Sequence, residues 1–71
     1  MQRTPVNSED ILSIGYNAEL QILEIEFNDN SVYQFVSVSA EVYTALVNAQ
    51  NKYNYYVAYI MNEFAGQCVS V

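Results

Sequence analysis

Apolar and polar residues alternate in three consecutive segments near the start of the chain, at residues 11–16, 21–27 and 31–36. In the first, Leu12, Ile14 and Tyr16 alternate with small residues. A period of two is typical of β-strands with one buried face. Asn and Asp, which tolerate the positive φ of hairpin turns, occur in the links at 17–19 and 28–30. The pattern predicts a three-stranded antiparallel β-meander.

The same periodicity predicts which side of the meander is buried. One face carries Leu23, Ile25 and Phe27 from the second strand, with Tyr33 and Phe35 from the third. The opposite face mixes acidic and apolar side chains, namely Ile22, Glu24, Glu26, Val32 and Gln34. We expect the first face to form the core. The opposite face could form an interface, but we expect Glu24 and Glu26 to be solvated there.

The period changes after Val38, where apolar residues recur at helical spacing. Ser39 is suited to be the N-cap of a helix over residues 40–49. After a break at 50–52, Tyr56, Ile60 and Phe64 repeat every four residues, which predicts a second helix ending at Gly66. We therefore predict an α+β fold, a three-stranded meander followed by two helices packed on one face. Residues 1–10 form a lead-in, and the tail 67–71 stays unassigned, although Val69 and Val71 could pair as a strand edge.

Composition narrows the chemistry of this single 71-residue domain. The chain has one cysteine, Cys68, and no histidine, so neither an internal disulfide nor a zinc site of the usual kind is expected. Without histidine, and with Lys52 as the sole lysine, the usual activated nucleophiles cannot be assembled. We expect a protein that is not an enzyme and needs no cofactor.

Eight acidic residues against Arg3 and Lys52 give a net charge of −6, which disfavours a long nucleic acid as partner. No signal-like or membrane-spanning run is evident, so we expect a cytoplasmic protein with no membrane partner, in the host cytoplasm if the chain is phage-encoded.

Ten aromatic residues favour a folded domain over a disordered one. Because so short a chain buries a limited core, we also expect a homo-oligomer.

The segment from Asn51 to Tyr59 has the most functional character, because four tyrosines flank a lysine. Tyrosine rings stack on flat ligands, lysine binds phosphate, and an arginine elsewhere can add a bidentate contact. The candidate ligand-binding residues are Arg3, Asn51, Lys52, Tyr53, Asn54, Tyr55 and Tyr56. A purely structural role remains the alternative, in which Tyr55, Tyr56 and Tyr59 pack the second helix onto the sheet.

Four short motifs occur in order along the chain: Ser13-Ile14-Gly15-Tyr16, Val32-Tyr33-Gln34-Phe35, Val42-Tyr43-x-x-Leu46 and Lys52-x-x-Tyr55-Tyr56. With them the chain resembles the KTSC domain family, over roughly residues 6–64. That family takes its name from a domain at the C-terminus of some lysyl-tRNA synthetases and also occurs alone in bacterial and phage proteins. The resemblance implies a possible role in RNA binding. Here, however, Ala58 and Tyr59 stand where the family has basic residues.

These observations favour a small ligand with flat rings and few phosphates. We expect a small nucleotide, with a cyclic dinucleotide as the most specific case, bound without turnover in a site shared between subunits. Such a module would sequester a signal, as phage-encoded sponge proteins do. The alternatives are a protein–protein interaction module that uses the same tyrosines and the RNA binding implied by the resemblance, which two cations support poorly.

Overall fold

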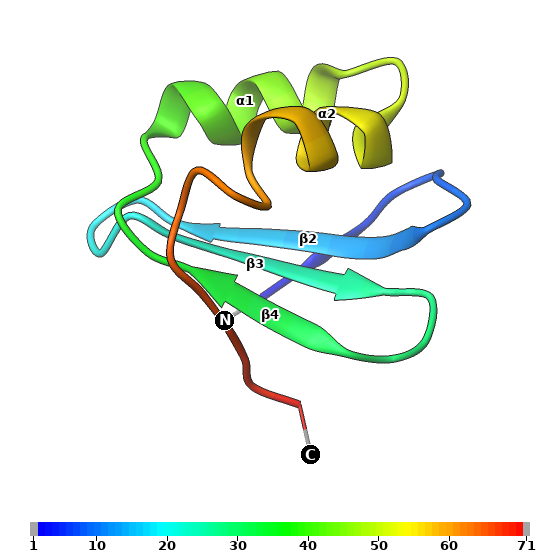
Figure 1. The fold of residues 1–71 in the computed structure, drawn as a ribbon, viewed down its shortest axis with the longest axis horizontal. Helices are drawn as coiled ribbons and strands as arrows, with labels where there is room; N and C mark the ends of the chain where they lie inside the picture. The colour runs from blue at the N-terminus through cyan, green and yellow to red at the C-terminus, as the bar shows by residue number, and fades with distance from the viewer. Residues whose placement is uncertain (1, 71) are drawn as a thin grey trace.

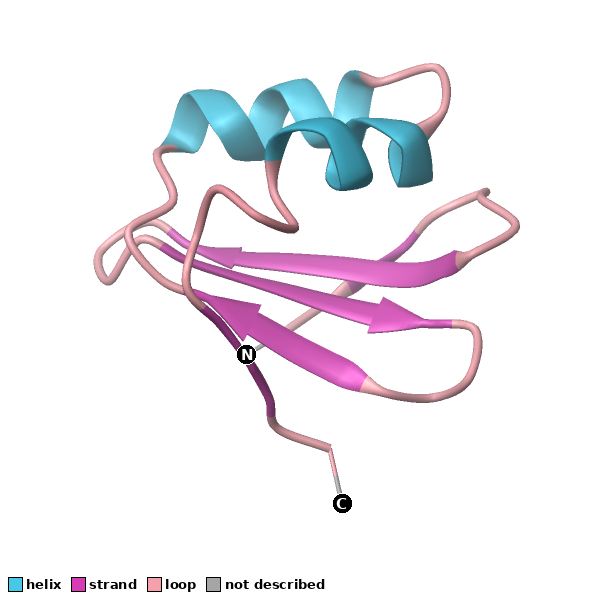
Figure 2. Cartoon of the chain, viewed as in Figure 1, coloured by secondary structure: helices cyan, strands magenta, loops and turns pink. Residues whose placement is uncertain are grey.

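Two helices lie on one face of a five-stranded antiparallel sheet in the computed structural model, which describes residues 2–70 (Figures 1 and 2). The strands neighbour one another in chain order. The elements are β1 (Thr4–Pro5), β2 (Ile11–Asn17), β3 (Ile22–Phe27), β4 (Val32–Phe35), α1 (Ala40–Asn48), α2 (Lys52–Tyr59) and β5 (Gly66–Cys68). The α+β class and the meander followed by two helices are confirmed.

The predicted number of strands is wrong, because two short strands flank the meander. β1 lies within the predicted lead-in and pairs with β2, while β5 starts at the predicted helix stop, Gly66, and pairs with β4. They have two and three residues, which is too short to show a period. Pairing with a neighbour, rather than their own pattern, defines them as strands.

The meander itself follows the predicted boundaries closely, with two local corrections. A register shift between Ile11 and Ser13 turns Ile11 into the core and leaves Leu12 exposed, so Leu12 does not share the buried face of Ile14. In the first turn, Gln21 rather than Asn17 has the positive φ, at 55°. Asn17 instead accepts a hydrogen bond from the Leu20 amide at 3.0 Å. In the second turn Asn30 has φ 70°, as expected for asparagine.

Side-chain caps begin both helices, but the second helix is shorter than predicted. Ser39 caps α1, as predicted from the sequence. α2 ends at Tyr59, where the predicted helix continues to Gly66. Beyond it the amides of Ile60 and Met61 both donate to the Tyr56 carbonyl at 2.9 Å, which closes the helix in a turn. The chain must reverse here because residues 66–68 pair with β4.

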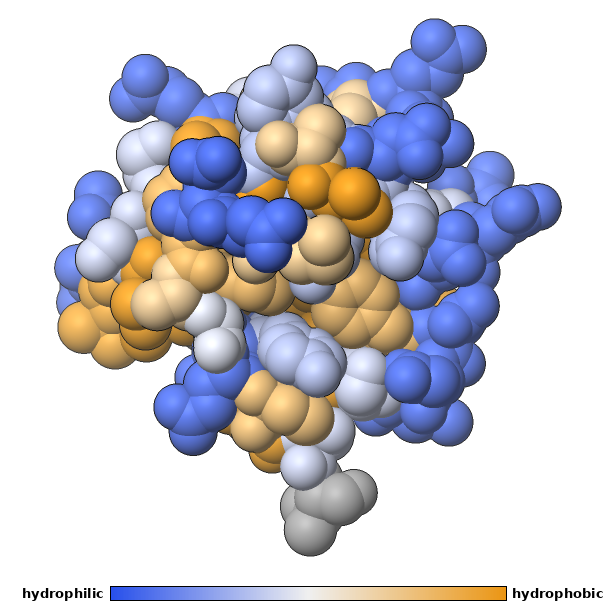
Figure 3. All heavy atoms as spheres, in the orientation of Figure 1, coloured by the Kyte–Doolittle hydropathy of each residue, from blue (hydrophilic) through white to orange (hydrophobic). Residues whose placement is uncertain are grey.

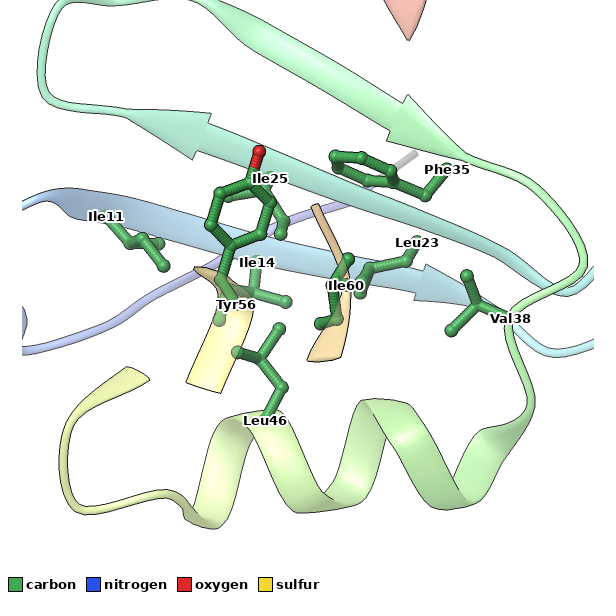
Figure 4. Packing of buried hydrophobic residues seen from close by; sticks show 9 residues of the cluster. All are labelled: Ile11, Ile14, Leu23, Ile25, Phe35, Val38, Leu46, Tyr56 and Ile60. Carbon is green, nitrogen blue, oxygen red and sulfur yellow. The ribbon is translucent and has the colours of Figure 1, made fainter. Parts of the chain in front are cut away.

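The core fills the space between the sheet and the helices (Figure 4). Its buried members come from β2, β3, β4, both helical segments and the link to α1, and they are Ile11, Ile14, Leu23, Ile25, Phe35, Val38, Leu46, Tyr56 and Ile60. Fully burying one Leu or Ile contributes about 1.5–3 kcal/mol. The predicted inward faces of β3 and β4 are thus confirmed, with Phe27 and Tyr33 half-buried beside the core.

Between residues 2 and 70, the helices are all too short or too polar to cross a membrane.

Candidate functional site

Two hollows adjoin at one end of the molecule, where the loop after β1, the β3–β4 turn and the α1–α2 loop come together (Figure 1). Asp10 lines both of them. This end, on the right of the view, presents mostly hydrophilic residues at the surface (Figure 3). We call the hollows the aromatic hollow and the polar hollow, after the residues that line them.

The aromatic hollow has a volume of about 290 Å³ between β3, β4 and α2. Its lining residues are Phe27, Tyr33, Tyr53, Tyr56 and Met61, with Asp10, Asn28, Asp29 and Ser31 as polar members. Phe27 packs edge-on against Tyr33, with ring centroids 5.8 Å apart, and Tyr53 lies 5.9 Å from Tyr56. The rings pack against one another, so each holds its neighbour in position.

The polar hollow has a volume of about 200 Å³ and is lined by Asn7, Ser8, Glu9, Asp10, Gln50, Asn51 and Lys52. Asn51 is the N-cap of α2, and its Oδ1 accepts from the Asn54 amide at 3.0 Å. Lys52 donates from Nζ to the Ala49 carbonyl at 3.2 Å. The ammonium group therefore lies at the negative end of the α1 dipole. One of its hydrogen-bond donors is used by the Ala49 carbonyl.

Titratable groups make the surroundings of the aromatic hollow acidic. Hydrogen bonds from the Ser31 hydroxyl and amide lower the pKa of the Asp29 carboxyl, so Asp29 is ionised at neutral pH. Burial, followed by the neighbouring Tyr53 and Tyr33, raises the pKa of the Tyr56 hydroxyl, which stays protonated. The hollow thus offers aromatic surface with carboxylate acceptors at its margin. Within residues 2–70, no cluster of side chains could hold a metal ion.

Arg3 lies on the sheet face opposite the helices, away from both hollows. Its guanidinium forms an ion pair with Glu24 through Nη1 and donates from Nε to Ser13 Oγ at 3.0 Å. Gln34 donates to the other Glu24 oxygen at 2.7 Å. Glu24 is only 5% exposed, so the expectation that it is solvated is wrong for this residue. Glu24 is buried because the side chains of Arg3 and Gln34 cover its carboxylate.

Gly15 leaves the space that Arg3 occupies. A Cβ at this position would lie 2.6 Å from the Gln2 carbonyl oxygen and 3.0 Å from Arg3 Cγ. These separations are too short for a side chain, so the segment just before β1 can approach β2 this closely only at a glycine. The Arg3 to Glu24 ion pair depends on this close approach.

The seven predicted site residues therefore divide into separate places. Asn51, Lys52, Tyr53 and Tyr56 line the two adjoining hollows, and Tyr56 is also part of the core. Asn54 is exposed outside them, and the Tyr55 ring packs against Tyr59 at an interplanar angle of 41°, with ring centroids 4.7 Å apart. Sequence reasoning missed Asp10, Phe27 and Asp29 as lining residues. Only folding brings the lead-in and the β3–β4 turn to α2, and no local pattern signals that contact.

Comparison with known proteins places the fold. A family model described as the KTSC domain matches residues 7–64. The chain belongs to the KTSC domain family. The crystal structure of a KTSC domain protein from Yersinia pestis superposes with a TM-score of 0.94 at 32% identity, covering 97% of each chain. A protein from Stutzerimonas stutzeri, described as uncharacterized, is 39% identical over 51 residues, 72% of each chain.

Most motif residues through which the chain resembles the KTSC family hold the fold together. Ser13 donates to Glu26 Oε1 at 2.9 Å, and Ile14 is in the core. Tyr16 donates to the Val38 carbonyl at 2.5 Å and stacks on Tyr43 with centroids 4.8 Å apart, which ties the sheet to α1. These KTSC motifs explain the shared architecture, whereas of the motif residues only Tyr33, Lys52 and Tyr56 reach the two hollows.

Proposed function

We propose that this KTSC domain is a non-catalytic module that binds a small nucleotide, with the base in the aromatic hollow and a phosphate near Lys52. The observation that carries the proposal is the adjacency of the two hollows at Asp10. Each is smaller than the about 300 Å³ at which pockets for drug-sized ligands begin. A ligand with an aromatic end and an anionic end, joined by a short linker, fits the two hollows together better than it fits one hollow alone.

The chemistry of the linings supports this orientation of the ligand. Tyr33 and Tyr53 offer ring faces, on which stacking contributes about 1–3 kcal/mol per base. Asp10 can accept hydrogen bonds from the amino group of a base or the hydroxyls of a ribose. Lys52 is the only cation among the described residues that line the polar hollow, so this lining suits a single phosphate better than a polyphosphate.

Sequestration is the mode of action that we propose for such binding. A protein that binds a nucleotide without converting it lowers the free concentration of that nucleotide by mass action. A cyclic dinucleotide, with two bases and two phosphates, would engage the hollows of two copies, each contributing one Lys52. A phage protein of this type would lower a nucleotide signal of its host.

A matched pair of variants on α2 tests the proposal. Tyr53→Leu removes a ring from the aromatic hollow, whereas Tyr59→Leu makes the same change on a side chain that is 58% exposed and outside both hollows. Isothermal titration calorimetry with AMP, GMP, cyclic AMP, cyclic di-AMP and cyclic di-GMP should detect at least one ligand. We expect Tyr53→Leu to weaken its binding about 5- to 150-fold and Tyr59→Leu to leave it unchanged.

Two further measurements complete this test. Lys52→Gln should weaken a nucleotide more than the corresponding nucleoside, because only the nucleotide carries the phosphate. Mass spectrometry of the bound ligand should recover it intact after incubation. If none of the panel binds, or if Tyr59→Leu weakens binding as much as Tyr53→Leu, the proposed site is wrong.

Protein interaction is a second candidate, favoured by the outer surface of α2 and the turn that follows it. Val57 and Met61 are exposed there, and the exposed Tyr59 packs against Tyr55. Exposed aromatic and apolar side chains are enriched at protein interfaces. The same variants separate the two functions, because a protein partner on this surface would be lost with Tyr59→Leu and kept with Tyr53→Leu. RNA binding is not proposed, since it would need contacts to several phosphates and the chain has only two cations.

A further inference from the structure

The outer edge of β5 presents unpaired backbone groups in a defined pattern. β5 is the last strand of the sheet and pairs with β4. At the two ends of this pairing, the Val36 amide donates to the Ala65 carbonyl at 3.1 Å and the Val69 amide donates to the Val32 carbonyl at 2.7 Å. Hydrogen-bonded positions alternate along an antiparallel strand. Gly66 and Cys68 therefore direct their N–H and C=O groups away from β4, toward the open side of the sheet as described over residues 2–70.

This edge lacks the devices that usually prevent strands from pairing with other chains. The opposite edge, β1, has two residues and ends in Pro5, which has no N–H. By contrast, no residue from Phe64 to Ser70 has a charged side chain. Charged residues or prolines on an edge strand are the common protection, and β5 has neither.

A shallow apolar hollow lies beside the same edge, on the sheet face opposite the helices. It measures about 180 Å³ and is lined by Gln34, Val36, Ala65, Gly66, Gln67 and Val69. Val36 is 45% exposed and Val69 is 40% exposed. Register places these side chains on one face, because Gln34 lies opposite Gln67 across β4 and β5.

We propose that β5 pairs antiparallel with β5 of a second copy of this chain, around a two-fold axis at Gln67. In this register Gly66 of one copy and Cys68 of the partner subunit exchange two backbone hydrogen bonds. The symmetry-related pair forms two more. Val69 of the partner subunit then lies opposite Ala65, on the face of the apolar hollow. The two sheets become one continuous sheet.

A second copy suits this edge better than an unrelated strand for two reasons. The unpaired groups of Gly66 and Cys68 are complementary to themselves when the strand is reversed, as an interface with two-fold symmetry requires. Each chain also has a net charge of −6, so two copies repel one another wherever charged surfaces meet. The uncharged stretch around β5 is a surface where that repulsion is small.

Sedimentation velocity under reducing conditions tests the dimer. The protein should be followed from about 10 μM to about 1 mM, since four hydrogen bonds and few apolar contacts make an interface below the about 1,200 Å² of a standard complex. Cys68→Pro removes an outward N–H, and Cys68→Ser at the same position keeps it. We expect the native protein and Cys68→Ser to dimerise alike, and Cys68→Pro to dimerise at least tenfold more weakly.

Val69→Asp provides an independent variant in case proline disturbs the fold. It places a carboxylate over the partner's apolar hollow while the Val69 amide keeps its bond to Val32, so we again expect a loss of at least tenfold. Hydrogen exchange of the Gly66 and Cys68 amides in the native protein should slow as the concentration rises. A protein that stays monomeric up to about 1 mM, or one that dimerises equally in all variants, overturns the proposal.

Discussion

Glu24 shows how one residue on an uncovered sheet face comes to be buried. No helix lies over this face within residues 2–70 (Figure 1), yet the carboxylate is covered by Arg3, which directly precedes β1, and by Gln34 from β4. Burial by itself raises the pKa of Glu24, but the hydrogen bonds from Gln34 and Arg3 and the charge of Arg3 outweigh it and lower the pKa below its ordinary value. The ionised form is therefore the stabilising one, and it secures the N-terminal segment to the sheet.

Glu24→Gln should lower the free energy of unfolding by about 1–3 kcal/mol at about pH 7, because Arg3 loses its charged partner. A carboxyl whose folded pKa is depressed stabilises the fold above its unfolded pKa and loses that contribution as pH falls through the folded pKa. The difference between native and Glu24→Gln proteins should therefore shrink below the ordinary value of 4.5.

Urea denaturation at about pH 7, 5 and 3 measures this difference directly. Glu19→Gln is the matched control, since Glu19 is exposed in a turn and should have little effect. A difference between native and Glu24→Gln proteins that stays constant from neutral to acid pH would contradict the role assigned to the ionised carboxylate.

At the scale of elements, the two helices depend on different caps. Ser39 Oγ accepts from the Val42 amide at 3.4 Å, whereas Asn51 Oδ1 accepts from the Asn54 amide at 3.0 Å. The longer bond is near the limit for a hydrogen bond, so it should contribute less. Asn51 also begins a helix of eight residues, too short to be stable without its cap and its packing.

Replacing each cap by alanine should separate their contributions. Asn51→Ala should cost about 1 kcal/mol of unfolding free energy, and Ser39→Ala should cost less. Asn48→Ala, at an exposed position in the last turn of α1, is the control and should be neutral or slightly stabilising. Thermal and urea unfolding measure all three, and equal losses for Ser39→Ala and Asn51→Ala would contradict the ranking.

The elements also show how far the sequence predicts this fold. β2, β3, β4 and α1 are each long enough to show their period, and the sequence predicts them within about a residue or two. β1 and β5 are defined by hydrogen bonds to neighbouring strands, and such long-range pairing leaves no local pattern. The early end of α2 has the same origin, since Gly66 must reach the edge of β4.

Prediction of the candidate site was limited in the same way. The segment after Asn51 contains lining residues because its tyrosines are visible in sequence, whereas Asp10 and Asp29 come from loops about 20 to 40 positions away along the chain. The sequence groups Arg3 with the segment after Asn51 on the basis of its chemistry alone. Its ion pair with Glu24 depends on the register of β1 against β2, which the two residues of β1 do not encode locally.

At the scale of the whole molecule, the net charge of −6 determines how two copies of the chain repel or attract one another. The chain has eight acidic residues, and both of its cations are engaged within the fold, Arg3 with Glu24 and Lys52 with the end of α1. Two copies that meet through the uncharged β5 edge gain no ion pairs and still repel at longer range. A dimer held instead by Arg3 or Lys52 against acidic residues of its partner would be stabilised by charge.

Salt distinguishes these two kinds of dimer by the sign of its effect. Raising ionic strength from about 0.05 M to about 0.5 M shortens the screening length from more than 10 Å to less than 5 Å. For pairing through β5, screening weakens the repulsion between two chains of charge −6, so the dissociation constant should fall. For a dimer held by ion pairs, the dissociation constant should rise. Sedimentation equilibrium in NaCl, repeated in KF to exclude an effect of one particular ion, measures the slope, and weaker association at high salt would rule out the uncharged edge as the interface.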